Sequence, residues 1–314
     1  MAWNIEESIG VPTSLMMDPG DRTDAQAIKL AVTHIRDAGF KTVEVAPGQF
    51  RSVAGKNAEA FLKNAFSVED RRDLRELLKS FRTVTVHGSG IVIHIPGEKG
   101  NGKEGQWAPY LELMRFARDI GARLVTFHSL QPAEGGSLDQ EVMAHYHVEF
   151  GKFASEYAQE WDLLAGFELA TTYPFFLAHR IIGRIGSQRF GILLDLGHVA
   201  LHFSQSADIT ASVLQVAEAC LDQTWEFHAG GVQFTSQGLR EHRPLDGHNI
   251  LDHGRLMDLL VRRDFRGPLI FEIFFQSSKP EQIPASLSQN LDVCAAAKQD
   301  ILRRLFGGFS PSAG

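Results

Sequence analysis

Six short apolar segments of the sequence each end in a side chain that can bind a metal ion or carry a proton. In chain order, these side chains are His87, His128, Glu168, Asp195, His228 and Glu272. One polar residue at such a place usually caps a neighbouring backbone group, but six in succession indicate a shared site. Clustered carboxylates repel one another and buried charge is costly, so they favour a bound cation. Because three carboxylates stand beside imidazoles, we expect a divalent metal ion, with Zn²⁺ or Mn²⁺ favoured over Co²⁺, Fe²⁺ or Mg²⁺.

The six segments are the last of eight strand-like stretches in the chain. We place the strands at residues 9–15, 42–46, 83–87, 123–128, 164–168, 191–195, 224–228 and 269–274. Amphipathic segments with helical spacing separate or follow them, at residues 23–39, 68–81, 108–121, 138–161, 174–186, 207–220, 254–264 and 286–306. Strands that are apolar throughout are typical of parallel sheets covered by helices on both faces.

Eight such strand–helix units predict an α/β protein with a single (β/α)8 TIM barrel over residues 1–306, followed by a disordered tail at 307–314. A doubly wound sheet is the rival fold, but it usually carries a glycine-rich turn after its first strand. The first strand here continues into SLMMDPGD, without a GxGxxG motif. In a TIM barrel the strand ends point into the active site, so we expect the six side chains to meet there.

Composition excludes several classes of protein. No apolar run approaches the roughly 18 residues of a membrane span, and the first residues predict no secretory signal. The two cysteines, Cys220 and Cys294, cannot form a disulfide framework or a CxxC site, so we expect a reduced, cytoplasmic protein. A formal charge of −7 argues against a broad basic surface for nucleic acid, although not against a local one. We expect a small-molecule substrate rather than nucleic acid.

Further polar residues lie close to these strand ends in the sequence. His198 stands three residues beyond the aspartate of the sixth strand, at the start of the following loop. The segment REHRPLDGHNILD, past the seventh strand, offers Arg240, His242 and Arg243 to a bound anion or a further metal. Glu44 ends the second strand, and we expect it to line the pocket.

Two other histidines, His145 and His147, lie inside the predicted helix 138–161. Residues two apart on a helix face different sides. We therefore expect both imidazoles at the surface rather than in a site.

The sequence resembles the xylose isomerase-like TIM barrels, which include sugar and sugar-phosphate isomerases and epimerases and the endonuclease IV type of abasic-site nuclease. The resemblance extends from about residue 9 to 274 and rests on VTVHGSG, LVTFHS, GFELA, LLDLGH, EFHAGG, EHRPLDG and GPLIFE. It implies that one divalent metal is held by Glu168, Asp195, His228 and Glu272. It also implies that His198 contacts the substrate.

In the nuclease branch, the resemblance implies further zinc ligands at His87, His128 and His242. An Asp-x-His pair is expected after the seventh strand, and this chain has Arg240-Glu241-His242 instead. A guanidinium cannot bind a metal and would repel one nearby. We therefore expect one or two metal ions, with His87 and His128 as ligands of the second, rather than a complete three-zinc centre.

The function that these features favour is a metal-dependent sugar or sugar-phosphate isomerase or epimerase. Both reactions begin by removing a proton next to a carbonyl, and a metal stabilises the resulting enediolate. Glu168 and Glu272 lie on strands roughly across the barrel, so they are the expected acid/base pair as well as metal ligands. Arg240 or Arg243 could hold a phosphate or carboxylate of the substrate.

Three alternatives use the same residues. A metal-dependent dehydratase or lyase acting on a keto-sugar, keto-inositol or dehydroshikimate-like acid begins with the same proton abstraction. For an abasic-site nuclease, His87 and His128 count in favour, whereas Arg240 and the acidic charge count against. A barrel that only binds a metal or ligand is the third alternative. The resemblance makes a homodimer or a homotetramer possible, and the sequence does not decide the oligomeric state.

Overall fold

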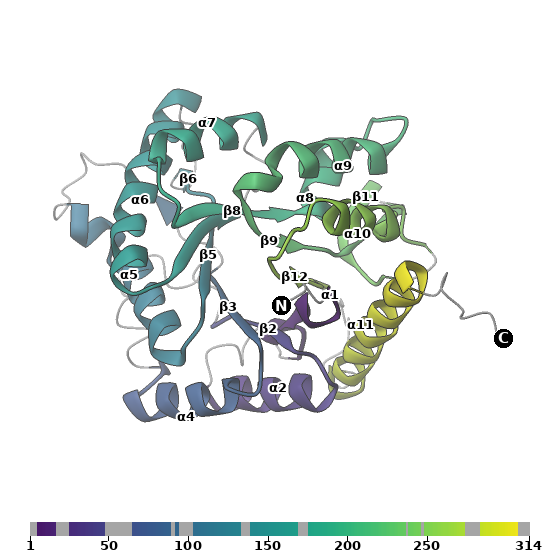
Figure 1. Ribbon diagram of the computed structural model, residues 1–314, viewed down its shortest axis with the longest axis horizontal. Coiled ribbons are helices and arrows are strands. Elements are labelled where there is room, and N and C mark those ends of the chain that lie inside the picture. Colours follow the sequence, from purple (N-terminus) through teal and green to yellow (C-terminus); the bar gives the residue numbers. More distant parts are fainter. Residues whose placement is uncertain are drawn as a thin grey trace.

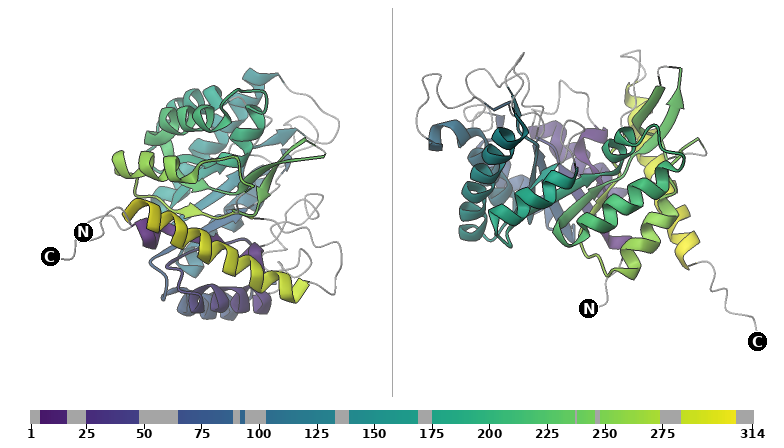
Figure 2. Two further views of the ribbon diagram at one scale, coloured as in Figure 1. Left: turned by 90° about the vertical axis from the view of Figure 1, so that its right-hand side faces the viewer. Right: turned by 90° about the horizontal axis from the view of Figure 1, so that it is seen from above.

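The structure is a computed structural model, and it describes residues 5–16, 25–47, 65–88, 92–93, 103–132, 139–168, 175–236, 238–245, 248–273 and 283–306. Within these residues, eight parallel strands close into a barrel, and helices lie around its outside (Figure 1 and Figure 2). The predicted (β/α)8 TIM barrel is therefore confirmed. The predicted tail, residues 307–314, lies outside the described residues.

The barrel strands lie where the apolar segments predict them. They are β1 (Ile9–Pro12), β2 (Thr42–Val45), β3 (Thr83–Gly88), β5 (Leu124–His128), β7 (Leu164–Glu168), β8 (Phe190–Asp195), β9 (Thr224–His228) and β12 (Leu269–Ile270). They follow one another around the barrel in this order, and β12 pairs with β1 to close it. β12 is shorter than predicted, so Glu272 lies just beyond its end.

The register of the parallel strands brings their polar ends together. His128 on β5 lies opposite Glu168 on β7, and Asp195 on β8 lies opposite His228 on β9. Because successive side chains of a strand point to opposite faces, the residues one position earlier point away from the barrel interior. The strand sequence therefore places ligands inside and apolar residues outside.

A group of phenylalanines supports two of these strand ends from behind. Phe127 and Phe167 stand one residue before the polar ends of β5 and β7, and both rings lie 5.4 Å from the ring of Phe150. Phe190, at the start of β8, lies 5.0 Å from Phe167. Tilted and edge-to-face aromatic contacts of this kind stabilise a pair by about 0.5–1.5 kcal/mol beyond the area that they bury. They restrict the movement of β5 and β7 relative to the helix that carries Phe150.

The predicted amphipathic segments form the outer helices. These are α2 (Ala25–Asp37), α4 (Val68–Leu78), α5 (Lys103–Ile120), α6 (Gln140–Glu160), α7 (Phe175–Ile185), α9 (Ile209–Cys220), α10 (His253–Arg262) and α11 (Ile283–Phe306). Asp139, Asp208 and Asp252 each accept a hydrogen bond from a backbone N–H in the first turn of α6, α9 and α10, which satisfies donors that a helix start leaves unpaired. Among the described residues, none of the helices has both the length and the apolar character of a membrane span.

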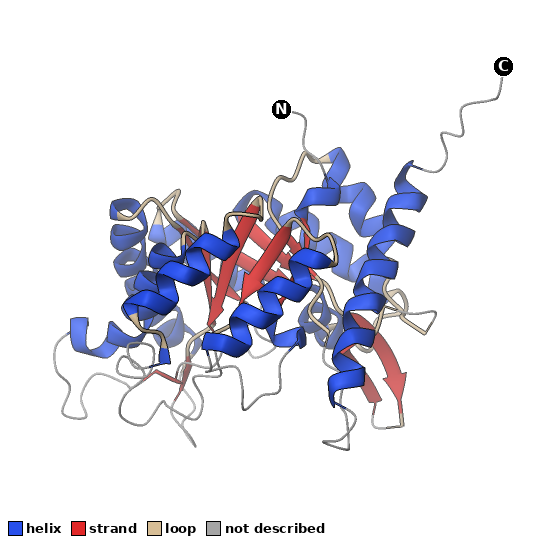
Figure 3. Ribbon diagram, turned by 90° about the horizontal axis from the view of Figure 1, so that it is seen from below, coloured by secondary structure: helices blue, strands red, loops and turns tan. Residues whose placement is uncertain are grey.

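Several elements were not predicted from the sequence. They are α1 (Ile5–Ser8), the 3-10 turns Thr13–Met16 and Leu221–Gln223, the paired β4 (Val92–Ile93) and β6 (Gln131–Pro132), α8 (Leu196–His202), and the antiparallel hairpin β10 (Gly231–Thr235) and β11 (Gly238–Arg243). The expected loops after the sixth and seventh barrel strands are thus a helix and a hairpin. Figure 3 shows the hairpin extending from the barrel on the side opposite the two termini.

Candidate metal centre

The six chelating side chains that end the strands come together in the structure, and we call them the mouth cluster. They are His87, His128, Glu168, Asp195, His228 and Glu272, from β3, β5, β7, β8, β9 and the segment after β12. Their side chains are largely buried, and the most exposed of them, that of His128, is only 22% exposed. Carboxylates withdrawn from water in this way need positive partners. Imidazoles supply part of this positive charge, and a bound metal ion would supply more of it.

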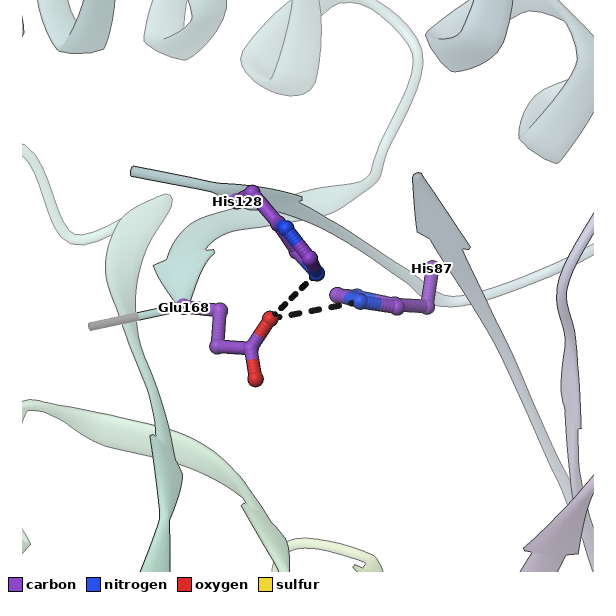
Figure 4. A group of neighbouring side chains, drawn as sticks. All are labelled: His87, His128 and Glu168. Carbon is purple, nitrogen blue, oxygen red and sulfur yellow. Dashed lines mark ion pairs between the residues drawn. The ribbon is translucent and has the colours of Figure 1, made fainter. Parts of the chain in front are cut away.

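Glu168 is the residue that three imidazoles share. Its Oε2 atom lies 2.8 Å from Nε2 of His128 and 3.3 Å from Nε2 of His87, and Figure 4 shows both rings pointing at this oxygen. Its Oε1 atom lies 3.3 Å from Nε2 of His198. Burial by itself would raise the pKa of Glu168, but the three histidines hold that pKa well below its ordinary value. Glu168 is therefore a carboxylate at neutral pH.

The four residues implied as metal ligands form one compact group. Ligand atoms from Glu168, Asp195, His228 and Glu272 all lie within 4.8 Å of one another, and all four residues are buried. Nδ1 of His228 lies 2.8 Å from Oε2 of Glu272 and 3.9 Å from Oδ2 of Asp195. Burial raises the pKa of Asp195, and the charges of Glu272 and Glu168 raise it further.

Asp195 provides the observation that tests whether a cation fits this group. Its Oδ1 atom accepts a hydrogen bond from the backbone N–H of His198 at 2.8 Å. Its Oδ2 atom is buried and has no hydrogen-bond partner among the described residues. A buried carboxylate oxygen without a donor is costly, and a metal ion would satisfy it. Three carboxylates and one imidazole are a suitable ligand set for a divalent ion.

Three further groups of ligand atoms adjoin this one, two at the mouth and one deeper in the barrel. His87 and His128 share Glu168, which is the arrangement predicted for a second metal ion. His198 and His242 share Asp195 in the same manner. Burial would lower the pKa of His198, but Asp195, Glu168 and a further glutamate raise it to about 12. Without a metal, these carboxylates are therefore compensated by charged imidazoles.

That further glutamate is Glu241, which the sequence analysis did not select. Its Oε2 atom lies 2.7 Å from Nδ1 of His198, and its Oε1 atom lies 3.7 Å from Nε2 of His242. The side chain of Arg240 is instead exposed. The carboxylate of Glu241, rather than the guanidinium of Arg240, therefore lies beside His198 and His242.

An irregularity in the hairpin lets two neighbouring residues face the site. In a regular strand, Glu241 and His242 would point to opposite faces. His242 has a φ of 53°, in the left-handed region, and the pairing of β10 with β11 has a register shift nearby. Such a bulge reorients side chains next to functional sites. Alternation in the sequence alone could not have shown that both residues reach the mouth cluster.

Two glycines allow the hairpin to lie against the mouth cluster. A Cβ atom on Gly197 would come within 2.9 Å of the Cβ of Glu241. A Cβ atom on Gly230 would come within 2.6 Å of the carbonyl oxygen of Glu272 and within 3.1 Å of the Cα of His242. A larger residue at either position would push the hairpin away. The glycines of LLDLGH and EFHAGG therefore have a packing role at the site.

Arg243 and Glu44, the other predicted binding residues, differ in how deeply they are buried. Arg243, at the end of β11, is half-buried, and its Nε atom is buried without a hydrogen-bond partner among the described residues. Glu44 is only 1% exposed and contacts Nε2 of His228, so it lies inside the barrel rather than at an open pocket wall. In the strand register Glu44 lies opposite Thr85, two residues before His87. It belongs to the layer of side chains below the mouth cluster.

This deeper layer contains polar residues that the sequence analysis missed. Glu226 is fully buried two residues before His228, and its Oε1 atom accepts a hydrogen bond from Oγ1 of Thr85 at 2.9 Å. The hydroxyl oxygen of Thr126 lies 2.9 Å from Nδ1 of His87. The sequence did contain a signal for Glu226, because strand alternation puts its side chain on the same face as His228. A buried acid in TWEFH is otherwise unexpected in an apolar strand.

The barrel fold agrees with a comparison of the sequence with known families. A model of the xylose isomerase-like TIM barrel family matches residues 32–294, and the chain belongs to this family. No curated protein matches the sequence.

Several solved structures share the fold. D-psicose 3-epimerase, in the presence of D-fructose, is 13% identical with a TM-score of 0.68, covering 96% of this chain and 100% of that chain. The IolI protein with a binding zinc atom is 14% identical with a TM-score of 0.62, covering 95% and 99%. A probable 3-DHS dehydratase from Bacillus anthracis is 14% identical with a TM-score of 0.62, covering 96% and 99%. At these identities the likeness shows the fold alone.

Proposed function

We propose that the chain is a divalent-metal-dependent isomerase or epimerase that acts on a sugar or sugar phosphate. The observation that carries the proposal is the buried group Glu168, Asp195, His228 and Glu272, in which Oδ2 of Asp195 has no hydrogen-bond partner among the described residues. The barrel is shared with D-psicose 3-epimerase, which supports a sugar as substrate. The zinc atom in the structure of IolI supports a metal at the same kind of barrel.

The four residues of this group would hold the ion, with Zn²⁺ or Mn²⁺ favoured by the mixed oxygen and nitrogen ligands. When bound, the ion supplies Lewis-acid stabilisation of the negative charge that develops on the substrate carbonyl oxygen. His87 and His128, with Glu168 between them, are the proposed ligands of a second ion.

The proton transfer is assigned to two glutamates. Glu168 ends β7 and Glu272 follows β12, and β8 and β9 lie between these strands in the barrel. Their carboxylates therefore approach a bound substrate from different sides. One, as a carboxylate, would remove the proton next to the carbonyl, and the other, in its protonated form, would return a proton to the opposite face or to the neighbouring carbon.

Residues around the two glutamates would orient the substrate. His198 has its Nε2 atom beside Glu168, where it can donate to a substrate hydroxyl. The Nε atom of Arg243 has no hydrogen-bond partner among the described residues, and a guanidinium binds a phosphate or carboxylate through paired hydrogen bonds. The exposed Arg240 and the imidazole of His242 remain predicted substrate contacts. The cytoplasmic location and the homodimer or homotetramer also stay predictions.

Exchange of substrate hydrogen with deuterated water tests the proposal. Metal-loaded protein is incubated with a panel of ketohexoses, ketopentoses and their phosphates, and deuterium next to the carbonyl is measured by NMR. We expect exchange with at least one sugar, accompanied by its epimer or isomer, and none after treatment with a chelator. A panel without any exchange would contradict the proposal.

A dehydratase is the nearest second candidate, because it begins with the same proton abstraction and a probable 3-DHS dehydratase shares the fold. The same experiment separates the two, because a dehydratase would release water and form a new double bond.

A nuclease is favoured by one specific observation. Glu241 supplies a carboxylate beside His198 and His242, where the sequence analysis expected a repelling arginine. Incubation with a DNA duplex that contains an abasic site tests this candidate. Metal-dependent nicking of the duplex, without sugar exchange, would assign the chain to the nuclease branch.

A further inference from the structure

His228 has a carboxylate at each of its two ring nitrogens. Nδ1 lies 2.8 Å from Oε2 of Glu272, on the side of the mouth cluster. Nε2 lies 2.9 Å from Oε2 of Glu44, in the deeper layer. The ring is fully buried and Glu44 is 1% exposed, so water does not compete for either contact. The function proposed above uses only the Nδ1 side of this histidine.

The contact with Glu44 decides which nitrogen of His228 can bind a metal. A neutral imidazole has one N–H donor and one lone pair, and the partner of one nitrogen determines which atom carries the hydrogen. At 2.9 Å, Oε2 of Glu44 is placed to accept a hydrogen bond from Nε2–H of His228, which favours a hydrogen on that nitrogen. Nδ1 contacts the carboxylate of Glu272 in the same way, so both ring nitrogens carry hydrogen in the absence of a metal. A bound ion would take the place of the hydrogen on Nδ1, the nitrogen nearest to Asp195 and Glu272, while Glu44 would keep the hydrogen on Nε2.

The position of Glu44 in the barrel makes this contact rigid. Thr42, Val43, Glu44 and Val45 of β2 are paired in register with β3, and β2 also pairs with β1. The carboxylate is therefore carried by a strand bonded on both sides rather than by a loop. Such a support holds the imidazole plane as well as its tautomer.

We propose that Glu44 is a positioning residue of the metal centre, which fixes the tautomer and orientation of His228 so that Nδ1 faces the carboxylates of Glu168, Asp195 and Glu272. This inference rests on the metal dependence in the proposed function, but not on the identity of the substrate. Glu44 thereby acquires a role other than contact with substrate at the pocket wall.

A second cation between Glu44, Glu226 and His228 is the competing explanation, because ligand atoms of these residues also lie within 4.8 Å of one another. In that arrangement His228 would bind ions through both nitrogens and would have to lose both ring hydrogens. A hydrogen bond from Nε2 to Glu44 needs no such loss. The two explanations predict different numbers of bound ions.

Metal titration of three variants tests the proposal. Chelator-treated wild type, Glu44→Leu, Glu44→Gln and Glu226→Gln are titrated with Zn²⁺ and with Mn²⁺ in competition with a chromophoric chelator. Glu226 is the matched control, because it is equally buried in the same layer but its hydrogen bond goes to Thr85. Thermal unfolding of each metal-free variant checks that it folds.

We expect Glu44→Leu to weaken metal binding by about 10–100-fold, as is usual when the partner of a histidine ligand is lost. Glu44→Gln should lose less, because its amide oxygen can still accept the Nε2–H, and Glu226→Gln should stay within about twofold of wild type. A Glu44→Leu affinity within about twofold of wild type would overturn the proposal. Loss of one bound ion with unchanged affinity for the rest would also overturn it, in favour of Glu44 as a ligand.

Nitrogen-15 NMR of the histidine rings gives a readout that needs no variant. In Zn²⁺-loaded wild type, we expect His228 to carry its hydrogen on Nε2 and to bind zinc through Nδ1, and the reverse assignment would contradict the proposal. A wild type that binds no metal would remove both this inference and the proposed metal dependence. Tight, Glu44-dependent binding without any sugar exchange would leave this inference standing and refute the proposed activity alone.

Discussion

Buried histidines in two regions of the molecule differ in charge although burial acts on all of them. In the mouth, carboxylates outweigh burial and raise the pKa of His87 to about 9 and that of His198 to about 12. Outside the barrel, burial dominates and lowers the pKa of His147 and of His253 to about 4. Since burial always favours the neutral imidazole, the difference comes from the carboxylates.

His147 shows how a buried histidine is held by backbone groups. It lies on α6, 4.8 Å from the ring of Phe167. Its Nε2 atom accepts a hydrogen bond from the backbone N–H of Leu130 at 3.0 Å, and Nδ1 donates to the carbonyl of Met143 at 2.7 Å. The residue thus anchors the chain just after β5, two residues beyond His128. The histidines of the mouth carry charge because carboxylates surround them, whereas His147 and His253 are neutral.

The largest expected effect follows from removing the carboxylate that the mouth histidines share. We predict that Glu168→Gln lowers turnover by at least about 10³-fold, because the residue is assigned as base and as ligand of both proposed ions. Glu272→Gln should lower turnover by a similar factor. Steady-state rates on the sugar identified by deuterium exchange provide the measurement, with the exposed Glu141→Gln as control. Near-normal rates in Glu168→Gln would remove its catalytic role.

A smaller effect concerns the contribution of the neutral His147 to the pH dependence of stability. His147 has a folded-state pKa of about 4, so between pH 6.5 and pH 4 the unfolded chain binds a proton that the folded protein does not. Its contribution to stability is complete above pH 6.5 and is lost as the pH falls toward 4. The loss amounts to about 3 kcal/mol, from about 1.4 kcal/mol per pKa unit.

Urea unfolding of His147→Gln and wild type between pH 4 and pH 7.5 measures this contribution. The variant should show the flatter decline below pH 6.5. His145→Gln is the matched control, because this residue is on the same helix but exposed, and its decline should equal that of wild type. Identical curves for His147→Gln and wild type would mean that His147 is not held neutral by burial.

The packing of the hairpin against the mouth allows a third prediction. Gly197→Ala should destabilise the fold by about 1–3 kcal/mol, because its Cβ would come within 2.9 Å of the Cβ of Glu241 and 3.0 Å of Oδ1 of Asp195. The displacement should also weaken the contact between Glu241 and His198. Urea unfolding at pH 7.5 measures the first effect, and unchanged stability would show that the hairpin moves aside freely.

The smallest expected effect comes from a glycine of the outer helices. Gly183 lies in α7, and a Cβ atom there would meet nothing within 4 Å among the described residues. Gly183→Ala should therefore stabilise the protein by about 0.5–1 kcal/mol through helix propensity. The same urea series gives the measurement, and a loss of stability would contradict the open space around this position.

The barrel could be predicted because its signal is local. Apolar runs mark the strands and amphipathic segments mark the helices, so all eight barrel strands were found. The hairpin was missed because GLREHR is polar and half-exposed, without the apolar alternation of a buried strand. The helix α8 was missed because its N-cap, Asp195, was interpreted only as the end of a strand.

The strand ends of the candidate site were predictable from the sequence, whereas its edge was less so. A shared register brings the strand ends together, and register follows from the strands themselves. Glu241 reaches the site through a positive φ at His242, which depends on tertiary packing. The prediction that His147 lies at the surface is wrong, because the face of α6 that packs on the barrel cannot be deduced from a spacing of two residues.

The most direct test of the metal centre is a crystal structure of the protein grown with Zn²⁺ and measured at the zinc absorption edge. We predict an anomalous peak about 2.0–2.2 Å from ligand atoms of Glu168, Asp195, His228 and Glu272. Absence of any peak there, with the carboxylates paired only to the histidines, would contradict the proposal that this cluster holds an ion.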